Sequence, residues 1–69
     1  MAGTVARITE ISASSTESFE DAIKVGVDRA NQTLRHVSSA WVKEQKITFK
    51  DGQVTGYQVN LLVTFVLDD

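Results

Sequence analysis

The chain has 69 residues, a formal net charge of −2 and no cysteine. Its length predicts a single domain spanning residues 1–69, and the acidic balance without a basic stripe argues against a nucleic-acid partner. The lack of cysteine excludes disulfides and thiolate metal sites, and one histidine is too few for a His-rich zinc site.

A chain this short buries only about 60% of the surface that its unfolded form exposes. Folds of this size are usually stabilised by disulfides, a metal or partner chains, so we expect self-association. No apolar run approaches the roughly 18 residues of a membrane span, and the first residues lack the charged-then-apolar order of a signal peptide. We therefore expect a cytoplasmic protein without a membrane partner.

The first predicted element is a strand over residues 4–11, TVARITEI, which are β-branched and roughly alternating. Residues 12–18, SASSTES, are predicted to form a loop rich in hydroxyls that cap helices. Within this loop, Ser14 and Glu17 fit a capping box, and Thr16 is a second N-cap candidate.

An amphipathic helix follows, with one apolar stripe over about five turns at i, i+3, i+4 and i+7 spacing. The stripe consists of Phe19, Ala22, Ile23, Gly26, Val27, Ala30, Leu34 and Val37. A glycine in mid-helix costs nearly 1 kcal/mol relative to alanine. Because Gly26 lies on the stripe, we infer that the helix approaches a sheet closely at this point.

Two long strands, residues 39–50 and 53–67, complete the chain and are joined at Asp51-Gly52. This dipeptide is a strong signal for a type I′ hairpin turn, which needs positive φ at both central residues. Strands joined by a hairpin pair antiparallel, and the helix covers one sheet face. The sequence therefore predicts an α+β fold of β-α-β-β order, with a three-stranded antiparallel sheet packed on one amphipathic helix.

The turn also predicts which residues share a face. With Lys50 opposite Gln53, the register gives four further pairs: Trp41 with Leu62, Glu44 with Val59, Gln45 with Gln58, and Ile47 with Gly56. The odd positions of the last strand are apolar without a break and must meet the helix. The even positions share the opposite, helix-free face with further apolar residues, namely Trp41, Ile47 and Phe49. Exposed apolar patches of this kind mark interfaces or ligand grooves.

No set of residues predicts catalysis. The single histidine, His36, sits at the end of the predicted helix, the glycines are isolated, and the carboxylates do not follow a calcium-loop spacing. We therefore expect a protein that is not an enzyme and has no metal site.

Trp41 and Gln58 are the strongest binding candidates. An indole offers a flat, electron-rich surface for a planar ring, and a primary amide offers a donor and an acceptor that match the edge of a pyrimidine-like heterocycle. The two residues lie about four positions apart along the hairpin, or roughly 13 Å, so two subunits are needed to hold one small ring with both. From the residues alone, packing of Trp41 as an interface anchor is favoured over stacking of a ligand ring.

Four segments of the chain resemble the dodecin family: STESFEDAIKVGVDRANQTLRHV, AWVKEQK, DGQV and YQVNLLVTFVLDD. The resemblance covers almost the whole chain and implies a non-catalytic protein that assembles into a hollow homododecamer built from trimers. Flavin-binding dodecins hold two stacked isoalloxazine rings between a symmetric pair of tryptophans at a two-fold axis, and a glutamine on the last strand hydrogen-bonds the ring edge. The resemblance thus implies storage or scavenging of a flavin, either riboflavin or FMN.

The resemblance also assigns individual residues. Gln58 matches the glutamine at the flavin edge, and Glu44 with Gln45 matches an acidic–amide pair that would serve the ribityl chain. A gap-free alignment places Ser39 where flavin-binding members carry the stacking tryptophan, and Trp41 stands two residues later, about 6–7 Å along the same strand face. The alternative implied by other family members is a dodecamer that binds calcium or coenzyme A, or one whose assembly is purely structural.

Overall fold

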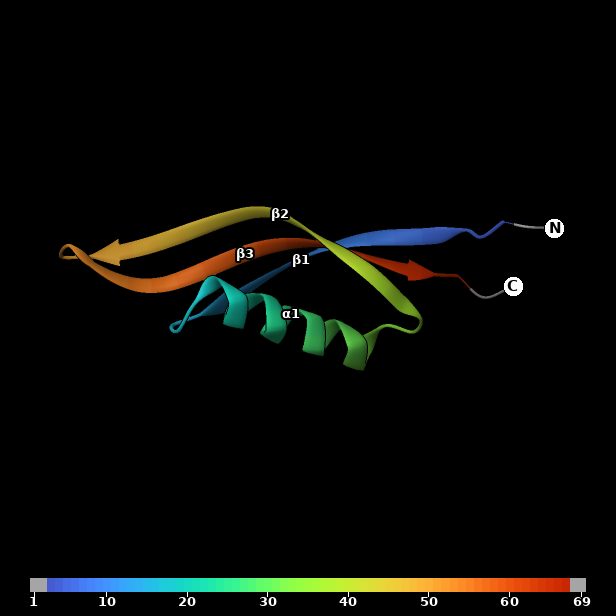
Figure 1. Ribbon diagram of the computed structural model, residues 1–69, viewed down its shortest axis with the longest axis horizontal. Coiled ribbons are helices and arrows are strands. Elements are labelled where there is room, and N and C mark those ends of the chain that lie inside the picture. Colours follow the sequence, from blue (N-terminus) through green and yellow to red (C-terminus); the bar gives the residue numbers. More distant parts are fainter. Residues whose placement is uncertain (1–2, 68–69) are drawn as a thin grey trace.

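A computed structural model describes residues 3–67. This part of the chain contains four elements, shown in Figure 1: β1 (Ala6–Ser15), α1 (Phe19–Thr33), β2 (Val37–Lys50) and β3 (Gln53–Val66). The strands form one antiparallel sheet in the order β1-β3-β2, and α1 lies against one face of it. The predicted α+β class with β-α-β-β order is therefore confirmed. In the described part of the chain, no helix is both long and apolar enough to cross a membrane.

The central strand β3 supplies the core. Its odd positions point toward α1, and Val59, Leu61 and Val63 are almost fully buried there. The prediction that the odd positions of this strand meet the helix is confirmed. Burial of such a side chain contributes about 1.5–3 kcal/mol, so this row is the main source of stability within one chain.

Strand β1 is longer than the sequence predicted. It continues through the serines to Ser15, because β3 provides partners as far as the pair Ser15–Tyr57. The predicted loop over residues 12–18 is therefore wrong for its first half. Pairing with a central strand outweighs the low strand preference of serine, since strand propensity depends strongly on context.

The start of the helix also differs from the prediction. Ser18 is the N-cap, and its Oγ accepts a hydrogen bond of 2.9 Å from the backbone N–H of Asp21. Capping by Ser14 or Thr16 is therefore wrong, and Ser14 instead pairs with Gln58 inside the sheet.

The helix ends earlier than its apolar stripe. It stops at Thr33, where Leu34 forms the C-cap in an extended conformation, and Val37 already begins β2. The prediction of a stripe over five helical turns is therefore too long. Leu34 and Val37 still pack against the core, which explains why their spacing looked helical in the sequence.

Small residues bring α1 close to the sheet, as the sequence predicted for Gly26. A Cβ atom at this position would lie 2.8 Å from Leu61 Cδ1 and 3.1 Å from Ala13 Cβ. Ala22 and Ala30, one turn before and one turn after, are also buried. Small side chains in the stripe therefore allow the backbone of α1 to pack closely against β1 and β3.

The hairpin turn has the predicted geometry, with φ of 52° at Asp51 and 77° at Gly52. The pairs Lys50–Gln53 and Trp41–Leu62 are confirmed. The register between them is wrong by one residue, because Thr55 forms a bulge on β3 that shifts the pairing. The observed pairs are Glu44 with Asn60, Gln45 with Val59, Lys46 with Gln58, and Ile47 with Tyr57.

A second bulge restores the predicted register. Lys43 is the extra residue on β2 between the pairs Val42–Leu61 and Glu44–Asn60. Because directly paired residues share a sheet face, Gln45 and Ile47 lie on the helix side between the two bulges. The prediction that they face away from the helix is therefore wrong.

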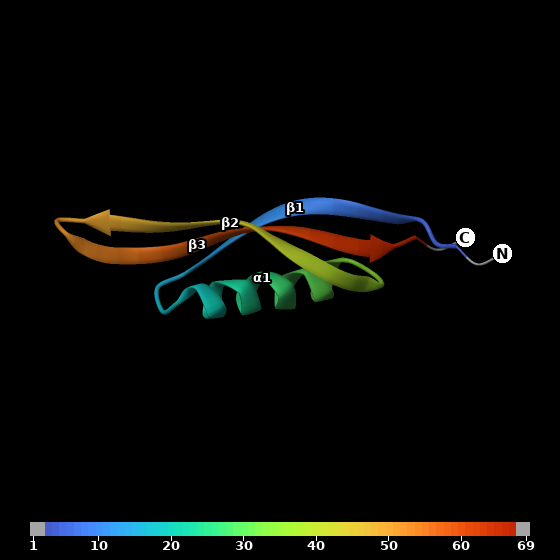
Figure 2. The ribbon, with the colours of Figure 1, turned by 45° about the horizontal axis from the view of Figure 1, so that its top comes forward.

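The sheet is much longer than the helix that covers it. The chain measures 57 × 19 × 14 Å, and Figures 1 and 2 both show the β2–β3 hairpin extending past the N-terminal end of α1. Phe49 and Val54, which pair near the hairpin tip, are 64% and 47% exposed. One copy of the chain therefore leaves apolar sheet surface in contact with water.

We predict that Gly26→Ala lowers the free energy of unfolding by up to about 2 kcal/mol. The gain in helix propensity is about 1 kcal/mol, but overpacking against the buried Leu61 costs about 1–3 kcal/mol. Urea titrations at matched protein concentration measure the effect. Lys24→Ala, on the exposed side of α1, is the control and should stay within about 0.5 kcal/mol. A stabilised Gly26→Ala variant would contradict the close approach.

We predict that Ser18→Ala lowers the free energy of unfolding by about 1 kcal/mol, because the N–H of Asp21 loses its acceptor. Thr16→Ala removes the hydroxyl of the other N-cap candidate and should change stability by less than about 0.5 kcal/mol. Thermal or urea unfolding followed by circular dichroism compares the two. Equal losses in both variants would show that Ser18 is not the dominant cap.

Candidate functional site

The sheet face opposite α1 carries the candidate residues, and we call it the open face. Its members follow from the strand pairing. On the central strand β3 they are Gln58, Asn60, Leu62, Thr64 and Val66. Their partners are Ser14, Ser12, Glu10, Ile8 and Ala6 on β1, and Lys46, Glu44, Trp41 and Ser39 on β2.

Trp41 is the most prominent apolar group of this face. Its side chain is 63% exposed, and it lies in one row across the sheet with Leu62 and Glu10. The next row toward the chain termini holds Ser39, Thr64 and the exposed Ile8. The indole therefore stands, with Leu62 and Ile8 nearby, on a mixed surface that no element among residues 3–67 covers.

Toward the hairpin, the open face becomes polar. Gln58 Nε2 donates a 2.9 Å hydrogen bond to Ser12 Oγ, and Asn60 Nδ2 lies 3.4 Å from Glu44 Oε1. A shallow pocket of about 300 Å³ is lined here by Glu44, Gln45, Lys46, Gln58 and Asn60. Amides, a carboxylate and an ammonium in one hollow suit a ligand with several hydroxyl groups.

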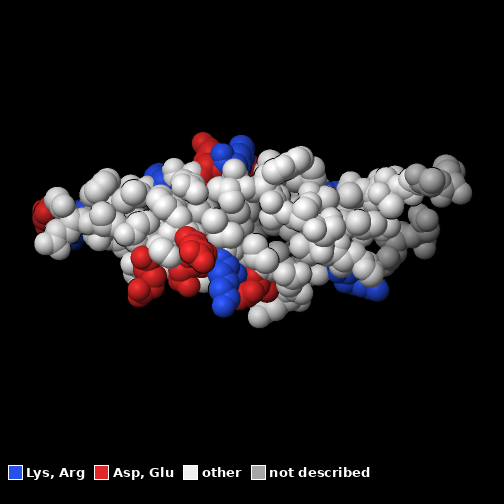
Figure 3. All heavy atoms as spheres, in the orientation of Figure 1, with Lys and Arg blue, Asp and Glu red and all other residues white. Residues whose placement is uncertain are grey.

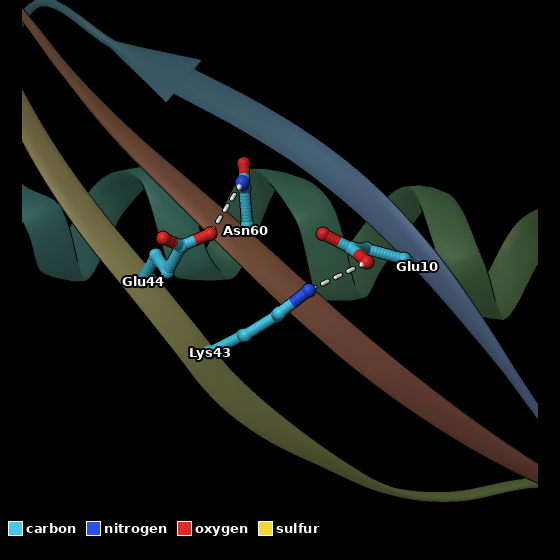
Figure 4. A network of polar contacts seen from close by, with 4 residues as sticks. All are labelled: Glu10, Lys43, Glu44 and Asn60. Atoms are coloured by element: carbon cyan, nitrogen blue, oxygen red, sulfur yellow. Dashed lines mark hydrogen bonds and ion pairs between the residues drawn. The ribbon is translucent and has the colours of Figure 1, made fainter.

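An ion pair separates the apolar part from the polar part. Figure 4 shows Lys43 and Glu10 reaching toward each other across β3, on the side away from α1. Lys43 Nζ lies 3.1 Å from Glu10 Oε1, and the two side chains are 46% and 44% exposed. Lys43 is the bulge residue of β2, and bulges often redirect a side chain in this way.

Asn60, beside the ion pair, has one unsatisfied atom. Its Oδ1 is buried and has no hydrogen-bond partner within the described part of the chain. A buried acceptor without a partner costs about 1–3 kcal/mol. A donor from a ligand or from a neighbouring copy would offset that cost.

The structure brings most of the predicted site residues onto one surface. Trp41, Ser39, Glu44 and Gln58 share the open face, whereas Gln45 pairs with Val59 on the helix side. Gln45 still lines the polar pocket. Trp41 is opposite Leu62, which lies four residues from Gln58 along β3. Trp41 and Gln58 are therefore separated by roughly 13 Å along the strand direction.

Two open-face residues escaped the sequence analysis, namely Glu10 and Lys46. Lys46 occupies the position opposite Gln58 that the sequence assigned to Gln45. Its place depends on the bulge at Thr55, which the neighbouring Gly56, an isolated glycine inside a strand, could have indicated. Glu10 could have been found from its alternation with Ile8 in the first strand, which places both on one face.

A further group of charged side chains lies on the helix. Figure 3 shows acidic side chains gathered over the N-terminal half of α1, and a second, mixed group of acidic and basic atoms over the sheet. Among residues 3–67, no group of three or more His, Cys, Asp or Glu side chains is placed to hold a metal ion.

Comparisons with known proteins connect this face to one family. The family model described as Dodecin matches residues 5–68. A dodecin of Thermus thermophilus is 39% identical over 67 residues, which cover 97% of each chain. The structure of dodecin from Streptomyces coelicolor superposes with a TM-score of 0.92 at 33% identity and covers 100% of this chain and 99% of that one.

A more distant solved structure is described by its calcium binding. The calcium dodecin of Mycobacterium tuberculosis, described as a calcium-chelating antigen with a novel calcium-binding site, superposes with a TM-score of 0.81. It is 27% identical to this chain, and the match covers 94% of this chain and 93% of that one.

Proposed function

The chain belongs to the dodecin family, and from this premise we propose that it binds and stores a flavin, riboflavin or FMN, without catalysing a reaction. We further propose that it does so as a homododecamer built from trimers, which the family resemblance implies.

The observation that carries the proposal is the exposed indole of Trp41 on a sheet face that one chain leaves uncovered. Stacking of a planar ring on an aromatic side chain contributes about 0.5–1.5 kcal/mol beyond the burial of area. A ring or a second copy that covers the exposed indole beside Leu62 removes apolar surface from water, which is favourable. Trp41 is the stacking group in this proposal.

Gln58 is the residue that recognises the ring edge. Its amide has a donor and an acceptor for the pyrimidine part of the isoalloxazine. Glu44 and Gln45 line the same hollow as Gln58. The Glu44 carboxylate accepts hydrogen bonds from the ribityl hydroxyls, and the Gln45 amide can donate to them or accept from them. Ser39, at the usual position of the stacking tryptophan, leaves room beside Trp41 rather than a second aromatic surface.

The distance between Trp41 and Gln58 supports a site made by two copies. Trp41 and Gln58 lie roughly 13 Å apart along the hairpin of one chain. One small ring cannot stack on Trp41 and hydrogen-bond Gln58 of the same chain across this distance. Two copies that face each other across a two-fold axis place Trp41 of one copy near Gln58 of the other. The exposed apolar residues Ile8 and Trp41 would then be covered in the assembly.

Calcium binding is the alternative, favoured by the similarity to the calcium dodecin. Because no carboxylate cluster is found among residues 3–67 of one copy, such a site would need residues from several copies. Coenzyme A, or a purely structural assembly, would leave Trp41 as an interface anchor.

We predict that the protein quenches riboflavin fluorescence at micromolar concentration and that Trp41→Ala weakens binding at least about tenfold. The loss of stacking and of buried area exceeds about 1.4 kcal/mol, which corresponds to a factor of ten. Fluorescence titration of riboflavin measures both proteins. Phe49→Ala is the matched control, because Phe49 is as exposed as Trp41 but lies near the hairpin tip.

Two outcomes would contradict this proposal. Unchanged riboflavin fluorescence with an intact assembly would exclude flavin storage, and calcium or coenzyme A titrations would then be compared. Equal losses in Trp41→Ala and Phe49→Ala would show that the indole acts only through the assembly.

We predict an assembly of about twelve chains in size-exclusion chromatography with light scattering. The physical reason is the uncovered sheet surface of a small chain, which is marginally stable alone. A stable monomer at micromolar concentration would contradict the assignment of the open face to contacts between copies.

A further inference from the structure

The segment of β2 between the two bulges, residues 44–48, is only weakly fixed in its register. All five of its residues are exposed, so neither face of the segment contributes a buried side chain to the core. Strands without a buried face specify their register weakly and are prone to slip. Because β2 lies at the edge of the sheet, a shift of this segment breaks strand pairing with β3 alone.

The two ends of this segment share one register, and only the middle departs from it. From Ser39 to Val42, and again at the hairpin tip, β2 pairs with β3 as the turn dictates. Residues 44–48 are offset by one position, and the bulges at Lys43 and Thr55 absorb the offset. A shift of the segment by one residue would therefore remove both bulges at once. We call the observed pairing the bulged register and the pairing without bulges the regular register.

The regular register gives partners to the two residues that the bulges leave out. In it, Lys43 stands opposite Asn60, and Thr55 stands opposite Thr48. The hydroxyls of Thr48 and Thr55 already form a hydrogen bond of 3.0 Å in the bulged register. This cross-strand threonine pair, of a kind that stabilises sheets, is therefore close to formed before the segment moves.

The contacts particular to the bulged register lie on the surface. Asn60 Nδ2 lies 3.4 Å from Glu44 Oε1, and Lys43 Nζ lies 3.1 Å from Glu10 Oε1 (Figure 4). Water competes for such exposed groups, so these contacts contribute little to stability. Ile47, which the bulged register turns toward the helix side, is still 39% exposed. Neither register therefore has a decisive advantage.

We propose that residues 44–48 exchange between the bulged and the regular register, and that this exchange switches the residue opposite Gln58 from Lys46 to Gln45. A shift of one residue moves each side chain of a strand to the other face. Lys46 therefore leaves the open face when Gln45 enters it. The hairpin is in this way a two-state element next to the polar pocket.

The exchange also reverses the charge beside Asn60. Its partner on β2 is Glu44 in the structure, and Lys43 takes that place in the regular register. Glu44 and Lys46 line the polar pocket only in the bulged register. A ligand or a second copy that contacts these two charged groups stabilises the bulged register, because a partner shifts an equilibrium by its difference in affinity for the two states.

The experiment captures each register with a disulfide in the full-length chain, which has no cysteine of its own. Lys46→Cys with Gln58→Cys, the bulged pair, places the thiols opposite each other in the bulged register. Gln45→Cys with Gln58→Cys, the regular pair, does so in the regular register. Directly opposite residues are close enough for a disulfide after a small adjustment, and residues on opposite faces are not. Ile47→Cys with Gln58→Cys is the control, because these positions are opposite each other in neither register.

Equilibration in a glutathione redox buffer without any ligand gives the effective concentration of each pair of thiols. Mass spectrometry of the denatured chains separates disulfides within one chain from those between copies. We expect both the bulged and the regular pair to exceed the control by at least about tenfold in effective concentration. The bulged pair should be the stronger of the two.

A glycine substitution tests whether the two registers compete. A Cβ atom at Gly56 would lie 3.1 Å from Thr48 Oγ1, and these residues are opposite each other only in the bulged register. Adding Gly56→Ala to both cysteine variants should therefore raise the regular pair and lower the bulged pair, with a change in their ratio of at least about threefold. Gly3→Ala, where a Cβ meets no atom within 4 Å, is the matched control and should leave the ratio unchanged.

Three results would overturn the exchange. The first is a regular pair that stays at the level of the Ile47 control with and without Gly56→Ala. The second is a regular pair that forms while the bulged pair does not. The third is a ratio that Gly56→Ala leaves unchanged. Because no flavin is present in these measurements, a failure of flavin binding would leave the register exchange intact.

Discussion

The contact between the small-residue stripe of α1 and the buried row of β3 determines the rest of the structure. At Gly26 the helix comes so close to Leu61 and Ala13 that a single methyl group would collide. This close packing fixes the helix on one face of the sheet. Because the chain has only this helix among its described residues, no element of the same copy covers the opposite face.

The register of the hairpin determines what that open face contains. Between the bulges at Thr55 and Lys43, every residue of β2 is shifted by one position relative to β3, and a shift of one exchanges the two faces. The shift turns Lys46 toward Gln58 and Gln45 toward the helix side, and the bulge itself sends Lys43 across the sheet to Glu10. The polar character of the site is thus a product of two irregularities that compensate each other.

Sequence alone could predict the features that depend on local patterns. It could not predict the features that depend on pairing with another strand. The Asp51-Gly52 turn, the apolar row of β3 and the tight approach at Gly26 follow from residue chemistry and periodicity, and the structure confirms them. The strand through Ser12–Ser15 exists only because β3 pairs with it. The bulges likewise arise from pairing. The pair Trp41–Leu62 was predicted correctly because Lys43 cancels the shift introduced at Thr55.

Ligand binding and assembly are coupled if the proposed site is correct, because both use the open face. A ligand ring that stacks on Trp41 of one copy and hydrogen-bonds Gln58 of another copy finds this complete site only in the assembly. Any ligand that binds only the assembled state stabilises it by mass action. Trp41 lies two residues after Ser39, the usual position of the stacking tryptophan. In this proposal the indole can still stack on a ligand ring from there. The spacing between the two copies must then change, so that Gln58 of the second copy reaches the edge of that ligand ring. In the proposed site, the position of Trp41 thus ties the geometry of the interface to the size of the ligand.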